Sequence, residues 1–273
     1  MMAGPADLRW RGGMLQPPMP QATADPILRQ AELLHRGGSP GTWGNLGLWR
    51  SGGDDYATAC RALAIEVGRA AGIAAGDRVL SIACGAGDEL VVWVGDFGAT
   101  QATGIEIDRA CTAATLAALP RVLPVHFDRV LCVDAAYHLS PRQAFIDAAF
   151  GLLRPGGRLA YTDLVVDRDR VGAPLLRAAA RLCGVPAADL GPAHKSVARL
   201  ATAGWVDIES SRLDDAVLGG FTRFVHLQGR RLGSAAWSAG WRRPRMTAGL
   251  IPLCRAAGLG YALIAATKEP TAA

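Results

Sequence analysis

The feature that most constrains the fold is a regular alternation of short apolar runs with helical segments between residues 78 and 163. The apolar runs and the helical segments between them are 78–83, 89–97, 100–105, 109–119, 127–133, 141–153 and 158–163. Buried strands separated by helices are typical of a parallel sheet that is covered on both faces. The chain is therefore predicted to be an α/β protein with a doubly wound, mostly parallel, Rossmann-like sheet.

The flanks of this alternating region are less regular. Residues 1–40 are expected to form a loosely ordered N-terminal arm, with a short helical pattern at 26–35. Residues 41–268 are expected to form one domain. Its parts are a core, a helical lid or insertion, and C-terminal strands and helices, at 72–163, 164–204 and 205–268.

Composition and charge narrow the class of protein. Half of the residues are hydrophobic and 19% are charged, which excludes a mostly disordered, collagen-like or coiled-coil chain. The formal charge is +5, but only two of the 29 basic residues are lysines and the arginines are scattered. We therefore expect no nucleic-acid partner.

Targeting and metal signals are not found in the sequence. Residues 1–20 contain charges and prolines where a secretory signal has an apolar run, and the apolar stretch at 247–267 is broken by Pro252 and Arg255. The expectation is a cytoplasmic protein without a membrane span, monomeric or homodimeric. The six cysteines lie far apart without a CxxC pair, so neither a metal site nor a disulfide framework is predicted.

A glycine loop follows the first apolar run. In the stretch 79–90 a buried strand leads into Gly85-Ala86-Gly87 and then into a helix, so the loop backbone can approach a ligand closely. Glu106 follows Gly87 by 19 positions at the end of the next strand, where its carboxylate can accept both hydroxyls of a ribose. Leu90 replaces the last glycine of the dinucleotide fingerprint, which disfavours a nicotinamide or flavin dehydrogenase.

A second set of motifs lies further along: Phe127-Asp-Arg-Val130, Tyr137-His138, Leu153-Arg-Pro-Gly-Gly-Arg-Leu159 and Asp163. With the glycine loop, these motifs resemble the class I S-adenosylmethionine-dependent methyltransferases of the small-molecule type, over roughly residues 43–267. The resemblance implies that the 41–268 unit is methyltransferase-like and binds S-adenosyl-L-methionine. The cofactor-binding residues that it implies are Ser81, Ala83, Gly85, Gly87, Glu106, Ile107, Val133, Asp134 and Ala135.

The sequence departs from the family pattern at two places. Ser81 stands where the family usually has an acidic residue, and Ala83 where it often has glycine. Asp128 follows Glu106 by only 22 positions, too few for a helix, a third strand and a loop. The third, edge strand is therefore predicted to be shortened or missing, so that either another segment covers the adenine ring or binding is impaired. These departures favour an alternative, a non-catalytic binding or partner protein of the same fold.

The candidate catalytic residues are His138, which follows the strand at 127–133, and Asp163, which ends the neighbouring strand. Methyl transfer is an in-line displacement, so the enzyme aligns the acceptor and removes its proton. His138 is the candidate base and Asp163 the group that orients it; in the alternative, His138 bonds to the backbone and Asp163 caps the next segment. The main hypothesis is methyl transfer to a small-molecule acceptor, with oxygen favoured. Aromatic residues expected to line its pocket, or else to pack in the core, are Trp43, Trp49, Tyr137, Phe221 and Phe224.

Overall fold

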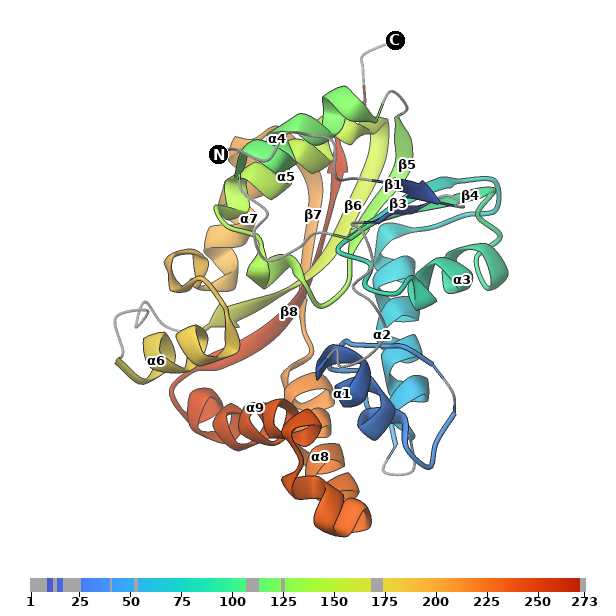
Figure 1. Cartoon of the computed structure of the whole chain (residues 1–273). Helices are drawn as coiled ribbons and strands as arrows, with labels where there is room; N and C mark the ends of the chain where they lie inside the picture. The colour runs from blue at the N-terminus through green and yellow to red at the C-terminus, as the bar shows by residue number, and fades with distance from the viewer. Residues whose placement is uncertain are drawn as a thin grey trace, which may run out of the picture.

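A computed structural model describes residues 9–11, 14–16, 26–39, 41–51, 54–106, 113–123, 126–167 and 174–270 of the chain. Its strands form one sheet of order β1-β2-β4-β3-β5-β6-β8-β7 (Figure 1). The strands are β1 (Arg9–Arg11), β2 (Met14–Gln16), β3 (Arg78–Ile82), β4 (Gln101–Ile105), β5 (Phe127–Cys132), β6 (Leu153–Val166), β7 (Trp205–Arg212) and β8 (Leu259–Lys268). β2 to β6 pair in parallel, whereas β1, β7 and β8 run antiparallel to their neighbours. The predicted doubly wound, mostly parallel sheet is confirmed.

Helices cover both faces of this sheet (Figure 1). Helices α2 and α3 lie on one face and α4, α5 and α7 on the other, while α1, α8 and α9 pack together at one end. Their bounds are α1 (Pro26–His35), α2 (Tyr56–Ala71), α3 (Asp88–Gly95), α4 (Ala113–Val122), α5 (Arg142–Leu152), α6 (Pro174–Cys183), α7 (Ala193–Thr202), α8 (Gly220–Leu232) and α9 (Ala239–Ala256). Alternate side chains of β3 enter two separate apolar cores, Val79 on the α2 face and Leu80 and Ile82 on the other.

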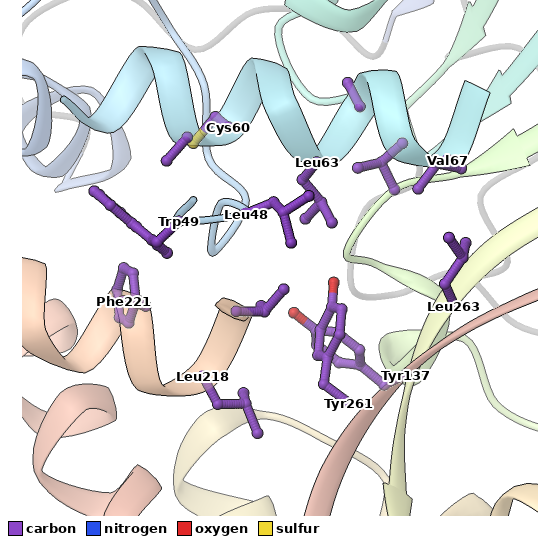
Figure 2. Close-up of a cluster of buried hydrophobic side chains, with 14 of the residues drawn as sticks. Leu48, Trp49, Cys60, Leu63, Val67, Tyr137, Leu218, Phe221, Tyr261 and Leu263 are labelled. Atoms are coloured by element: carbon purple, nitrogen blue, oxygen red, sulfur yellow. The ribbon is translucent and has the colours of Figure 1, made fainter. Parts of the chain in front are cut away.

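Helix α2 has clear start and stop signals and carries the core of its face. The Asp55 carboxylate caps it by accepting the Thr58 N–H at 2.7 Å, and Gly72, at φ 63°, ends it in the left-handed conformation. Between these caps, Leu63 and Val67 point toward Leu48, Leu218 and the two tyrosines Tyr137 and Tyr261 (Figure 2). These apolar side chains therefore connect α2 with the segment before it, the turn after β5, the turn before α8, and β8.

The Arg-Pro-Gly-Gly stretch, near the start of β6, interrupts the pairing of β6 with β5. Phe127 pairs with Leu153, and the next pair along β6 is Arg129 with Arg158, so residues 154–157 bulge out of the ladder. A Cβ on Gly157 would lie 3.0 Å from the Asp128 carbonyl oxygen. The glycine is needed because the two backbones approach each other closely.

The edge of the sheet beside β4 is built by the N-terminal segment. Between β4 and β5 the described residues form α4, and no strand occurs among them, as the short spacing predicts. Instead β2 pairs in parallel with β4, Met14 opposite Gly104 and Leu15 opposite Ile105. The expectation of a loosely ordered arm therefore does not hold for β1 and β2, which the sequence did not predict.

The described part of the chain also bears on the expectations for membrane spans, disulfides and metal sites. None of its helices is long and apolar enough to cross a bilayer. Five cysteines are described, and all of them are free thiols. No group of three or more potential ligands able to hold a metal ion occurs among these residues.

Candidate active site

The glycine loop forms a tight turn at the carboxyl end of β3. Ala83 has φ 59° and its N–H donates to the Ile105 carbonyl at 2.6 Å; Gly85 and Gly87 have φ 59° and 92°, and α3 begins after Gly87. A Cβ placed on Gly85 would meet no atom within 4 Å. The loop backbone therefore faces open space, as close approach to a ligand requires. Positive φ at Ala83 also explains why glycine suits this position.

Glu106 lies directly beside this loop. It follows β4, its side chain is half-buried, and its Oε2 accepts the backbone N–H of Gly85. The structure thus brings together the two residues that the 19-residue spacing singles out. The neighbouring prediction, Ile107, falls outside the described residues.

Ser81 does not face the loop's open side. It is fully buried, and its Oγ accepts the Trp93 Nε1–H at 2.8 Å. Ser81, which the resemblance names among the cofactor-binding residues, therefore has no surface of its own at the open side of the loop, because β3 directs its side chain under α3. Sequence reasoning missed the carboxylate of Glu89 in the first turn of α3, which is buried and hydrogen-bonded to Ser81. The available signal was its four-residue spacing from Trp93 on one helix face.

Asp134 is the most fully hydrogen-bonded of the predicted site residues. It has φ 55° at the end of β5; its Oδ1 accepts the hydroxyls of Tyr137 at 2.9 Å and Tyr261 at 2.7 Å, and its Oδ2 accepts the Leu46 N–H at 2.6 Å. Burial raises the pKa of Asp134 to about 6, against the lowering effect of these donors. Figure 2 shows the two tyrosines side by side with both hydroxyls directed toward α2.

The flanking predictions Val133 and Ala135 differ in exposure. Val133 is buried in the core on the α2 face, whereas Ala135 is half-buried. Ala135 therefore has surface that a ligand can reach at this strand end, whereas Val133 has almost none.

A segment before α2 crosses the site, and we name residues 41–49 the strap. Near its start, the Thr42 backbone N–H and hydroxyl both donate to the Asp88 carboxylate at the beginning of α3. Further along, the Leu46 N–H reaches Asp134 at the end of β5. The strap thereby ties the glycine loop's helix to the neighbouring strand end, the position expected of a lid.

The aromatic residues predicted for the acceptor pocket divide into two groups. Trp49 stacks on Phe224 with ring centroids 4.7 Å apart, and Phe221 is buried beside them between α2 and α8, which is the core-packing alternative. Trp43, in the strap, is half-buried, and the Tyr137 hydroxyl donates to the Asp134 carboxylate. The sequence identified aromatic residues around the site but not which of them pack in the core.

Two cavities lie away from the glycine loop. One of about 370 Å³ is lined by Trp49 and Phe224 together with Arg36, Arg223 and Arg231. The other, of about 420 Å³, lies between α5 and α7. Neither touches Gly85 or Glu106, so the site is defined by its side chains and backbone geometry.

The predicted pairing of His138 with Asp163 is corrected. Asp163 is buried, and its two carboxylate oxygens accept from Arg142 Nε at 2.8 Å and Nη2 at 3.0 Å. A buried carboxylate needs such a partner, and Arg142 lies at the start of α5, four residues after His138. The His138 Nδ1 instead lies 3.0 Å from the Gly184 carbonyl oxygen, in the segment after α6.

Comparisons with known proteins agree with the fold and the motifs. No family model matches the chain. A curated protein, erythromycin 3''-O-methyltransferase from Saccharopolyspora erythraea, is 29% identical over 209 residues, 67% of this chain and 68% of that protein.

Solved structures with the same fold include the [4+2]-cyclase SpnF, with TM-score 0.61, 20% identity and coverage of 90% and 92% of the two chains. A methyltransferase from Geobacter sulfurreducens in complex with S-adenosyl-L-homocysteine has TM-score 0.56, 19% identity and coverage of 90% and 99%. Taken with the glycine loop, Glu106 and the sheet order, these similarities support the resemblance of the chain to the class I S-adenosylmethionine-dependent methyltransferases.

Proposed function

We propose that this enzyme transfers the methyl group of S-adenosyl-L-methionine to a hydroxyl oxygen of a small molecule. The observation that carries the choice of oxygen is the 29% identity with an O-methyltransferase over two thirds of both chains. The site supports it, because polar groups converge where β3, β4 and β5 end, the edge at which open α/β sheets bind ligands.

The residues at this edge fit the cofactor. The open face of Gly85 admits a ligand against the loop backbone, and the Glu106 carboxylate lies within hydrogen-bond reach of that loop. Glu106 would hold the ribose hydroxyls, and Ala83, Gly85 and Ala135 would border the amino-acid portion. When bound, the cofactor supplies an electrophilic methyl group on a sulfonium. The strap and the tyrosines beside Asp134 would exclude water from it.

His138 is the proposed base for the acceptor hydroxyl. A carbonyl oxygen accepts hydrogen bonds only, so the Gly184 carbonyl holds the imidazole tautomer with its proton on Nδ1. This tautomer has its basic lone pair on Nε2, the nitrogen that would take the proton of the hydroxyl as the oxygen attacks. Asp134 is a poorer base, because three donors already occupy its carboxylate.

The alternative, a non-catalytic protein of this fold, rested on Ser81 and the missing third strand. However, a buried carboxylate, that of Glu89, lies beside Ser81, and β2 pairs with β4 at the edge where the third strand is missing. The cofactor site therefore retains a carboxylate and an edge strand, and catalysis is the better account.

The test is His138→Gln, with His194→Gln, at an exposed position of α7, as the matched control. Methyl transfer from labelled S-adenosylmethionine is measured on hydroxyl acceptors and on their amine and thiol analogues. The expected loss in kcat for His138→Gln is about 10²–10⁴-fold, with unchanged affinity for S-adenosylhomocysteine. Transfer to amines or thiols alone would contradict the oxygen acceptor, and unchanged kcat would contradict the base.

A further inference from the structure

One buried carboxylate at the glycine loop has no role in the reaction described so far. The Glu89 side chain, in the first turn of α3, is 5% exposed, and its Oε1 has no hydrogen-bond partner among the described residues. An ionised carboxylate in such surroundings is unfavourable unless a cation or several donors meet it. A buried polar atom without a partner requires an explanation, and at a ligand loop a contact with the ligand supplies one.

The other side of this carboxylate is held by a short hydrogen-bonded chain. Trp93 Nε1 donates to Ser81 Oγ at 2.8 Å, and Ser81 is in turn hydrogen-bonded to Glu89. A serine hydroxyl has one proton, and since its oxygen accepts from Trp93, that proton is directed to the Glu89 carboxylate. Trp93 and Ser81 therefore orient Glu89 from below the loop.

The charges around Glu89 favour a cation. The charged groups that act on it are the carboxylates of Glu106 at the end of β4 and Asp88 on its own helix, and the Cys84 thiol lies close to both Glu89 and Glu106. Burial, with these like charges, raises the pKa of Glu89 to about 8. A positively charged ligand group would reverse this unfavourable arrangement.

We propose that Glu89 binds the ammonium group of the cofactor's amino-acid portion. In this chain the carboxylate comes from helix α3, and Ser81 on β3 is a positioning residue that holds it. The inference rests on the proposed function, because it assumes that the cofactor occupies the glycine loop.

Binding by this route releases a proton. At pH 7 most unliganded molecules hold a proton on Glu89, because the pKa of its carboxyl is about 8. The ammonium group stabilises the carboxylate, so that proton passes to solvent when the ligand binds. Affinity should therefore rise by up to about tenfold per pH unit below pH 8, level off above it, and fall again where the ligand's ammonium group loses its proton.

The test uses calorimetry of S-adenosylhomocysteine binding to the full chain in two buffers of different ionisation enthalpy. The wild type is expected to release close to one proton at pH 7, and Glu89→Gln to release none and bind about tenfold to a hundredfold more weakly. Methylthioadenosine, which lacks the amino-acid portion, is expected to bind both proteins equally. Asp96→Asn, at the exposed end of α3, is the matched control for loss of one negative charge.

The proton released by the wild type tests the proposal without any variant, and a second pair of variants tests whether a carboxylate supplied from β3 can replace Glu89. Ser81→Asp/Glu89→Gln returns a carboxylate to the same pocket from the strand, whereas Ser81→Asn/Glu89→Gln does not. The first is expected to bind S-adenosylhomocysteine at least tenfold more tightly than the second. Equal affinities in either comparison would overturn the role of Glu89, while failure of the wild type to bind would overturn the proposed function instead.

Discussion

At the residue scale, Gly85 allows a direct test of the loop. Gly85 and Gly72 have φ 59° and 63°, and a Cβ on either would meet no atom within 4 Å. Gly85→Ala and Gly72→Ala should therefore lose similar stability, about 1 kcal/mol each, from left-handed backbone strain. Only Gly85→Ala should weaken S-adenosylhomocysteine binding, because its methyl group enters the ligand's space. Thermal unfolding and calorimetry measure both effects; equal binding by the two variants would contradict the placement of the ligand.

The positions and partners of the site residues could be predicted from the sequence to different extents. Gly85 and Glu106 were predictable because each lies at the carboxyl end of a strand, and parallel strands bring these ends together. Asp163 also ends a strand, but the sequence does not show which cation will be buried next to it. Its partner is Arg142, which lies in a stretch with the ordinary pattern of a helix start. Glu89 was missed because a first-turn glutamate is usually a solvated capping residue.

At the scale of elements, one hydrogen bond of the strap, from the Leu46 N–H to Asp134, can be tested by substitution. Asp134→Asn leaves an amide that cannot accept from Tyr137, Tyr261 and the Leu46 N–H together. We expect a loss of about 1–3 kcal/mol in unfolding free energy and faster amide exchange at Leu46. Asp147→Asn, on the outer part of α5, is the control. Unchanged exchange at Leu46 would show that the strap is fixed by other contacts.

The helices and central strands followed from periodicity, but the edge of the sheet did not. The helix at 26–35 and the strand at 127–132 occur close to where apolar spacing predicts them. β1 and β2 span three residues each, too short for an alternating pattern to be recognised. Their pairing with β4 depends on a long-range contact that local sequence does not encode.

At the scale of the whole molecule, the parallel core has the expected arrangement, and each of the two departures from the family pattern has a counterpart elsewhere in the chain. The carboxylate lacking at Ser81 is present at Glu89 on the adjoining helix, and the strand lacking after β4 is replaced by β2 from the N-terminal segment. Each departure, taken alone, indicates an impaired cofactor site. In the tertiary structure a buried carboxylate neighbours Ser81 and a strand pairs with β4, which is why we propose an intact cofactor site.

The central claim is that S-adenosylmethionine binds at the glycine loop with its ribose on Glu106. Calorimetric titration of S-adenosylhomocysteine into the wild type and Glu106→Ala, with NAD as the comparison ligand, tests it most directly. The account predicts one site per chain with micromolar affinity, no binding of NAD, and affinity about tenfold to a hundredfold weaker in the variant, because charge-assisted bonds to the ribose are lost. Absence of S-adenosylhomocysteine binding, or equal affinity in the folded variant, would contradict it.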